Sequence, residues 1–223
     1  MPSMRFLSYN IRLALEAGIN AVVDTIREIN ADIIALQEVG EFWPMGPQLR
    51  LTDEIAKAAA YPHSVFAGAL HEKGGDYGIG LISRWPITNP GKILLPQCVD
   101  EQRIILHAQI PQKNLSLWTT HLSVVQKDRD NQIRWVLGAL EKEKPDIFMG
   151  DLNTSLSDPQ LARIPMLSTF TDPAPATYPT HAPTTTIDHI LYGPRLSLYK
   201  EAQTYDSRAS DHLPVFAELE SIE

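Results

Sequence analysis

The segment Ile147-Phe148-Met149-Gly150-Asp151-Leu152-Asn153 shows the pattern on which the interpretation of this chain depends. Its first four residues predict a short buried strand, and two polar residues follow directly. If the backbone stays extended, Asp151 and Asn153 project to one side and Leu152 faces the core. Taken alone, Asp-x-Asn is also a common turn signature. Because the carboxyl ends of strands form the ligand-binding edge of many α/β folds, the segment predicts a polar site at a sheet edge.

The same pattern recurs along the chain, with a polar residue at the end of an apolar strand. Asn10 follows Leu7-Ser8-Tyr9, Glu38 follows residues 33–37, and His121 follows Leu117-Trp118-Thr119-Thr120. Asp211 and His212 lie just before a final apolar run at residues 214–216. Each residue alone fits an ordinary capping, turn or core role. Their repetition at strand ends instead predicts one composite site.

Asp188 interrupts the apolar run Ile187-Asp188-His189-Ile190-Leu191. A charge inside a buried strand requires a partner. An imidazole is the natural candidate, since a carboxylate bonded to one ring nitrogen fixes the tautomer and raises the basicity of the other. We expect His212 to be that partner.

Short apolar runs alternate with helical patterns, which predicts an α/β chain with mixed sheets. A three-and-four spacing of apolar residues predicts helices around residues 19–29 and 133–140, and a weaker, alanine-rich helix spans 49–60. Residues 103–110 and 115–120 predict an antiparallel hairpin, whereas strand-helix-strand order on either side of it predicts parallel neighbours. The proline-rich stretch 158–183 predicts an irregular loop that either shapes substrate access or serves as a packed connector. The predicted strands are 4–9, 32–37, 78–83, 103–110, 115–120, 146–149, 187–192 and 214–219.

The composition of the chain limits its domain number, its binding partners and its cellular compartment. The 223 residues are 43% hydrophobic and show no linker or repeat, so we expect one domain over residues 1–223. The formal charge of -8 provides no general attraction to nucleic acid. Any phosphate must therefore be bound by a few nearby side chains or an ion. One cysteine, Cys98, and no leader pattern favour a cytoplasmic protein. We also expect a monomer without stable membrane insertion.

Taken together, these motifs resemble the endonuclease/exonuclease/phosphatase superfamily, the metal-dependent phosphodiesterases and phosphatases related to DNase I. The matching motifs occur in the family's order and extend over nearly the whole chain. They are Ser8-Tyr9-Asn10-Ile11, Leu36-Gln37-Glu38-Val39, Thr120-His121-Leu122, Gly150-Asp151-Leu152-Asn153, Ile187-Asp188-His189-Ile190 and Ser210-Asp211-His212-Leu213-Pro214. The resemblance implies a DNase I-like, four-layered α-β-β-α sandwich with two packed mixed β-sheets.

The resemblance also implies a metal site. Glu38 looks like the main Mg²⁺ or Mn²⁺ ligand, with Asn10 beside it and Asp211 reaching the ion directly or through water. Hard oxygen ligands suit such an ion, which keeps several waters for exchange with a phosphate.

The remaining motif residues resemble the family's catalytic groups. Asp151 with Asn153 would orient and deprotonate the attacking water, and His121 and His212 would bind phosphoryl oxygens. Asp188 would hold His212, which is also a candidate for the base in place of Asp151. We also expect Arg103, at the start of the predicted hairpin, to contact the substrate phosphate.

The predicted function is a metal-dependent phosphodiesterase that attacks phosphorus in line with an activated water. The first candidate substrate is DNA or RNA, and the alternative is a phospholipid head group or small phosphodiester, as in sphingomyelinases. Abasic-site endonucleases typically carry an acidic residue where this chain has Arg12. The other class of function is a catalytically silent binding protein on the same fold, but every expected site residue is present.

Overall fold

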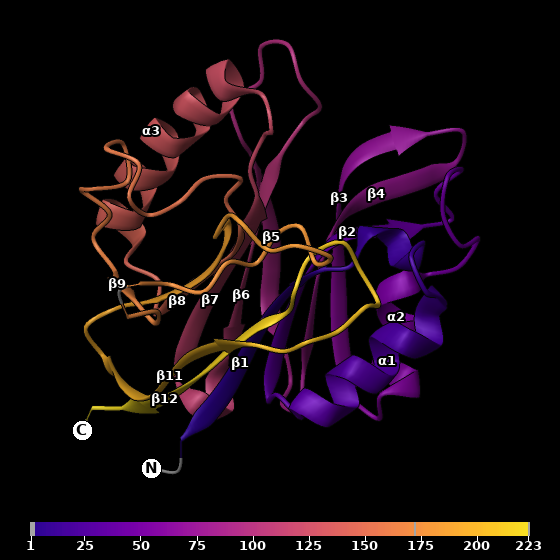
Figure 1. The fold of residues 1–223 in the computed structure, drawn as a ribbon, viewed down its shortest axis with the longest axis horizontal. Helices are drawn as coiled ribbons and strands as arrows, with labels where there is room; N and C mark the ends of the chain where they lie inside the picture. The colour runs from indigo at the N-terminus through magenta and orange to yellow at the C-terminus, as the bar shows by residue number, and fades with distance from the viewer. Residues whose placement is uncertain (1–2, 172, 223) are drawn as a thin grey trace.

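The computed structural model describes residues 3–171 and 173–222, in which two six-stranded sheets pack face to face with helices outside them (Figure 1). The first sheet has the order β11-β12-β1-β2-β4-β3, and the second has the order β5-β6-β7-β8-β10-β9. The four-layered sandwich predicted from the sequence is therefore present. The strands of the first sheet are β1 (Met4–Asn10), β2 (Ile33–Glu41), β3 (His63–Glu72), β4 (Gly75–Ser83), β11 (Leu196–Thr204) and β12 (Val215–Ser221). Those of the second are β5 (Thr88–Leu94), β6 (Ile104–Ile110), β7 (Leu115–His121), β8 (Ile147–Asp151), β9 (Leu167–Ser168) and β10 (Asp188–Tyr192).

Three α-helices cover the outer faces in the described part of the chain. The apolar sides of α1 (Gly18–Ile29) and α2 (Leu51–Ala58) pack on the first sheet, and α3 (Gln126–Glu143) packs on the second. Two short 3₁₀ turns, η1 (Arg12–Ala14) and η2 (Pro111–Lys113), follow β1 and β6. The helix expected over 49–60 is shorter, because the chain bends away at Ala59 and Ala60 has a positive φ.

A parallel pair lies inside each sheet and positions the site. β1 runs parallel to β2, and β7 runs parallel to β8, while the flanking pairs are antiparallel. The register places Asn10 beside Gln37 and His121 beside Asp151. Since parallel strands run toward the same edge, β7 and β8 bring two polar strand ends together, as the sequence predicted, and β1 ends beside Gln37 within β2.

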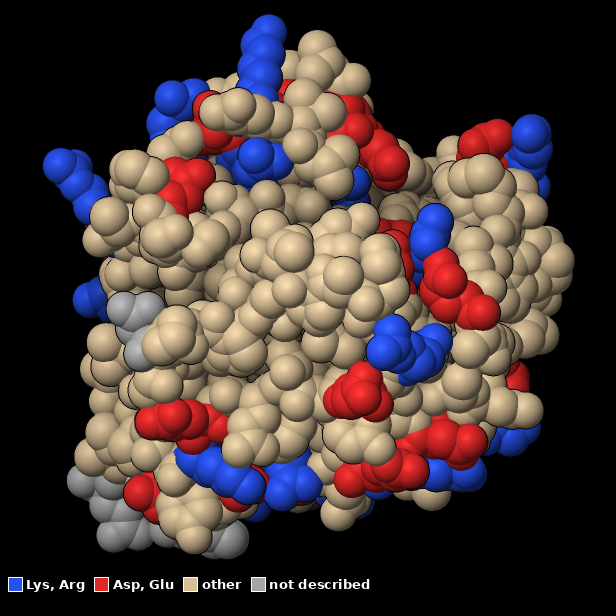
Figure 2. Space-filling model, in the orientation of Figure 1, with Lys and Arg blue, Asp and Glu red and all other residues tan. Residues whose placement is uncertain are grey.

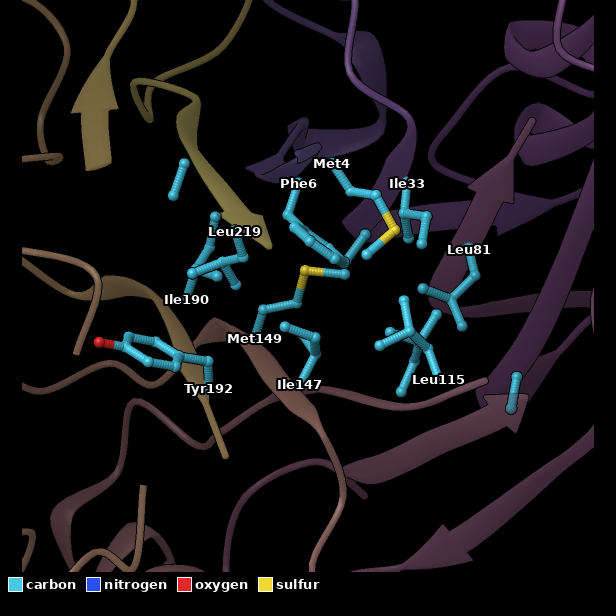
Figure 3. Packing of buried hydrophobic residues seen from close by; sticks show 14 of the residues in the cluster. Met4, Phe6, Ile33, Leu81, Leu115, Ile147, Met149, Ile190, Tyr192 and Leu219 are labelled. Atoms are coloured by element: carbon cyan, nitrogen blue, oxygen red, sulfur yellow. The ribbon is translucent and has the colours of Figure 1, made fainter. Parts of the chain in front are cut away.

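Three apolar clusters hold the layers together. The central cluster lies between the sheets, and Figure 3 shows Phe6 of β1 and Met149 of β8 within it. Both side chains are almost completely buried, as is Ile147. The alternation within β8 explains this packing, because Ile147 and Met149 face the other sheet while Phe148 faces α3. A truncation such as Met149→Ala at a site of this kind costs about 2–5 kcal/mol.

Every strand predicted from the sequence is present, and the predicted hairpin is the antiparallel β6–β7 pair. The sequence did not predict β3, β5, β9 or β11. These strands are partly exposed and lie at or near sheet edges, so they lack the uniformly apolar runs by which the central strands were recognised. None of the helices in the described ranges has the length and apolar character needed to span a membrane.

Candidate active site

Asp151 is the centre of the polar cluster. It is the last residue of β8, and only 1% of its surface is exposed. Its Oδ2 accepts a hydrogen bond from Asn10 Nδ2 at 3.1 Å. The same oxygen lies 3.5 Å from His121 Nε2 and 3.8 Å from His212 Nε2. A strand end in each sheet and the loop before β12 thus converge on one carboxylate.

The predicted pair of His212 and Asp188 is present. His212 Nδ1 lies 2.9 Å from Asp188 Oδ2, and the hydroxyl of Thr177 donates to the same oxygen at 2.7 Å. Burial alone would lower the pKa of His212, but the neighbouring carboxylates of Asp188, Asp151 and Asp211 outweigh it and raise the pKa to about 9. With Nδ1 directed at Asp188, the Nε2–H faces Asp151.

The pKa of Asp151 is raised, as expected for a buried carboxylate that acts as a base. Burial and the charge of Asp188 raise it to about 7, against the opposing effects of His212 and the hydrogen bonds from Asn153 and Asn10. A carboxyl group with this pKa exchanges a proton near neutral pH.

His121 presents a neutral ring to the same centre. Arg103 Nη1 lies 2.9 Å from His121 Nδ1, and an arginine can only donate, so Nδ1 is the acceptor and the ring hydrogen is on Nε2. Burial, together with the positive charges of Arg103 and His212, holds the pKa of His121 well below its usual value. Arg103, expected at the substrate phosphate, is itself buried, and its Nε has no partner among the described residues. Arg103 therefore contacts the Nδ1 side of the His121 ring, opposite the Nε2 atom that faces Asp151.

Glu38 is placed by a β-bulge. The sequence predicted that Glu38 follows its strand, but β2 continues to Glu41 and the register with β4 shifts between Gln37 and Val39. Glu38 has a φ of 53°, so the bulge redirects its side chain within a continuing strand. Its Oε1 accepts a hydrogen bond from Asn10 Nδ2 at 2.9 Å. Asn10 therefore links Glu38 to Asp151.

Arg12 connects the third expected metal ligand to the other two. Its backbone N–H donates to Asn10 Oδ1 at 3.1 Å, and its Nη1 lies 3.4 Å from Asp211 Oδ2. Asn10 thus contacts Glu38 directly, Asp211 is linked to Asn10 through Arg12, and all three offer hard oxygen donors. This donor set fits Mg²⁺ or Mn²⁺.

A second group of potential ligand atoms comes from Asp151, Asp188 and His212, which lie within 4.8 Å of one another. Within this group, His212 and Asp188 already satisfy each other through a hydrogen bond. A metal ion bound there would have to displace that bond.

Asn153 has a different conformation from the one predicted. The backbone is not extended, because Asn153 has a φ of 50°. Its N–H donates to Asp151 Oδ1 at 2.8 Å, and its Nδ2 donates to the Leu122 carbonyl at 2.8 Å. The turn restrains the Asp151 carboxylate and ties the end of β8 to the end of β7, while Leu152 is buried as expected.

Besides Arg12, other described residues of the site were not among the predicted ones. Tyr77 is a neighbour of Glu38, and burial and the Glu38 charge raise the pKa of Tyr77. Thr177 and Tyr178 contact Asp188 and His212 from the proline-rich loop. That loop therefore reaches the site, although nothing in its local sequence marks these two residues.

The fold and the site define a class: a four-layered α/β sandwich with carboxylates, amides and imidazoles gathered at one edge of its two sheets. The chain belongs to the endonuclease/exonuclease/phosphatase family, whose model matches residues 7–212. The family's name covers enzymes that hydrolyse phosphoesters. No match was found among curated proteins.

Solved structures share the architecture. An endonuclease/exonuclease/phosphatase from Beutenbergia cavernae superimposes with a TM-score of 0.82 at 22% identity, covering 99% of this chain and 72% of that one. The mannosyl-6-phosphatase Bt3783 of Bacteroides thetaiotaomicron gives a TM-score of 0.73 at 15% identity, covering 97% and 99%. The human nocturnin catalytic domain with bound sulfate gives 0.72 at 18% identity, covering 99% and 94%. At these identities the likeness shows a common fold.

Proposed function

We propose that this protein is a metal-dependent phosphodiesterase in which an activated water attacks phosphorus in line with the leaving oxygen. The observation that carries the proposal is the environment of Asp151. This buried carboxylate contacts Asn10, which also contacts Glu38, and it faces the Nε2 atoms of two histidines. A base, hydrogen-bond donors and a set of oxygen ligands therefore lie within one site, as phosphoryl transfer requires.

Glu38, Asp211 and the amide oxygen of Asn10 are the residues that would hold Mg²⁺ or Mn²⁺. A bound ion would supply charge stabilisation to the phosphoryl oxygens in the transition state. The bulge in β2 sets the direction of the Glu38 side chain, while Arg12 contacts both Asn10 and Asp211.

Asp151 is the proposed base and His212 the proposed proton donor. The pKa of about 9 keeps His212 protonated at neutral pH, whereas the pKa of about 7 leaves a large fraction of Asp151 ionised. Asp151 can therefore accept the proton of the attacking water, and His212 can hydrogen-bond or protonate the oxygens at phosphorus. This assignment favours Asp151 over His212 as the base.

His121 and Asn153 complete the proposed machinery. The Nε2–H of the neutral His121 ring would donate to a non-bridging phosphoryl oxygen, with Arg103 fixing the tautomer from the other side. The N–H of Asn153 restrains one oxygen of Asp151 and so directs the other toward the reacting water. These donors stabilise charge that increases in the transition state.

Nucleic acid is the first candidate substrate and a small phosphodiester or phospholipid head group is the second. The names of two solved neighbours provide context, since one is a mannosyl-6-phosphatase and another carries a sulfate anion. A silent binding protein on this fold is disfavoured, because all nine predicted site residues are retained and the catalytic ones contact one another.

The test is a hydrolysis panel run with and without divalent metal. Metal-free protein is assayed with EDTA, Mg²⁺ or Mn²⁺ on bis(p-nitrophenyl) phosphate, plasmid DNA, RNA, sphingomyelin, inositol phosphates and mannose 6-phosphate. We expect no turnover in EDTA, recovery with either metal, and loss of activity in Glu38→Ala. Glu54→Ala, at an exposed carboxylate on α2, is the matched control and should retain activity. Full activity in chelator, or in Glu38→Ala, would refute the proposal.

A further inference from the structure

Tyr178 is an aromatic side chain beside the proposed proton donor. Its ring centroid lies 4.7 Å from that of His212, and the two planes are inclined by 44°. The residue is 36% exposed, so one part of the ring packs against the imidazole and another part faces solvent. Its hydroxyl makes no hydrogen bond with any residue that the structure describes.

The backbone around Tyr178 is held on both sides, which fixes the point from which the ring extends toward His212. The Tyr178 N–H donates to the Thr185 carbonyl at 3.0 Å, and the N–H of Thr185 returns a bond to the Tyr178 carbonyl at 3.0 Å. On the other side, Leu213 N–H donates to the Thr177 carbonyl at 2.8 Å, and Thr180 N–H donates to the Asp211 carbonyl at 2.7 Å. The segment 177–180 therefore runs against 211–213. A ring held in this way is preorganised for binding.

The two arginines that contact predicted site residues are already engaged with protein groups. Arg103 is buried against His121, and Arg12 forms ion pairs with Glu16 and Asp211. Figure 2 shows lysine and arginine side chains interleaved with acidic ones on the visible face, without one basic stripe. Affinity for an extended nucleic acid depends on neutralising several phosphates at once. Of the two candidate substrates of the proposed function, this arrangement favours the second, a small phosphodiester recognised near a single phosphate, over nucleic acid.

We propose that Tyr178 is a specificity-determining residue that stacks against a planar ring of the substrate next to the scissile phosphate. The substrate class is then a compact phosphoester with an unpaired aromatic or heteroaromatic substituent. The inference rests on the proposed function, because it assumes that the phosphate binds at His212. Offset or tilted stacking between aromatic faces favours a planar partner over a saturated ring of similar size.

Three phosphonates that differ only in their substituent isolate this contact: methylphosphonate, cyclohexylphosphonate and phenylphosphonate. Their dissociation constants are measured by calorimetry on the whole protein with Mg²⁺ present. We expect phenylphosphonate to bind about 5- to 150-fold more tightly than methylphosphonate, the range that stacking on one aromatic side chain provides. Cyclohexylphosphonate should fall between them.

Variants separate stacking from a structural role. Tyr178→Ala should lose the preference for phenylphosphonate over methylphosphonate, so that its affinity falls more for phenylphosphonate than for methylphosphonate, while Tyr178→Phe should keep the preference. Tyr199→Ala, which removes an exposed tyrosine of β11, is the control and should behave as wild type.

Two results would overturn the inference. An equal loss of affinity for all three phosphonates in Tyr178→Ala would show that Tyr178 only positions His212, and equal binding of the cyclohexyl and phenyl compounds would exclude stacking. Failure of the proposed function gives a different result, in which no phosphonate binds and bis(p-nitrophenyl) phosphate is not hydrolysed.

Discussion

Asp151 and Asp188 are direct cross-strand partners on the antiparallel β8–β10 pair, and both are almost completely buried. Two carboxylates so placed repel each other unless a cation or a proton lies between them. His212 fills that role by bonding to Asp188 through Nδ1 and facing Asp151 through Nε2. The β8–β10 register therefore places Asp188 where its charge raises the pKa of both Asp151 and His212.

The Asp188–His212 bond makes Asp188 a positioning residue. We expect Asp188→Asn to lower kcat about 10²- to 10⁴-fold, the usual contribution of general acid–base assistance, because the ring of His212 loses its orientation and its charge partner. His212→Ala should lose at least as much while the protein stays folded. Turnover is measured on bis(p-nitrophenyl) phosphate and folding by circular dichroism. An unchanged kcat in either variant would remove the pair from the mechanism.

Variants of Thr177 should lower kcat less than Asp188→Asn does, because they remove only part of what holds Asp188. Its hydroxyl is one of two groups bonded to Asp188 Oδ2, so Thr177→Val should give a smaller loss than Asp188→Asn, and Thr177→Ser should restore most of it.

The raised pKa values predict how the stability of the metal-free protein depends on pH. The pKa of Asp151 rises from 3.8 to about 7, so its contribution is complete below pH 3.8 and is lost as pH rises through 7. The pKa of His212 rises from 6.5 to about 9, so its contribution is complete below pH 6.5 and is lost as pH rises through 9. The free energy of unfolding in EDTA should therefore fall between pH 5 and pH 9.

Asp151→Asn tests which group is responsible for that fall. Since Asn does not ionise, this variant should lose the decrease near pH 7, keep a decrease at higher pH, and exceed wild type in stability above pH 7. Urea titrations in EDTA at a series of pH values measure this. Parallel curves for the two proteins would contradict the assignment of Asp151.

Arg103 should control the protonation of His121. Removing its charge in Arg103→Met should raise the pKa of His121, since that guanidinium is one of the causes that lower it. NMR titration of the His121 ring in metal-free protein follows the change, and Arg103→Lys keeps the charge as the control. We also expect a loss of kcat in Arg103→Met, because no donor at Nδ1 then holds the hydrogen of the neutral ring on Nε2. Identical His121 titrations in all three proteins would exclude this coupling.

Tyr77 should support metal binding through Glu38. Neighbours of a metal ligand typically contribute about 10- to 100-fold to metal affinity, so Tyr77→Phe, which removes the hydroxyl of such a neighbour, should weaken Mn²⁺ binding by that order. Trp43 packs on the ring with centroids 5.5 Å apart and should keep the phenyl group in place. Calorimetric titration with Mn²⁺ measures the effect, with Tyr199→Phe as the control. Equal affinities would limit Tyr77 to packing.

The sequence predicted the central strands well and the edge strands poorly, for one physical reason. The strands β1, β2, β7, β8 and β10 are buried on both faces and appear as continuous apolar runs. Edge strands such as β5 and β11 mix polar, small and apolar residues, because one face or one edge meets solvent. Their pairing depends on neighbours that local sequence does not specify.

For the candidate site, the amino-acid sequence by itself determined which residues stand at strand ends, because burial of a strand forces its polar residues to the ends or into pairs. This is how Asn10, His121, Asp151 and the Asp188–His212 pair could be identified. Only the tertiary structure decided the contacts between them, since these join residues far apart in the chain. The bulge that redirects Glu38, the turn at Asn153, and the packing of Tyr178 on His212 arise from sheet register and loop closure, which no short segment encodes.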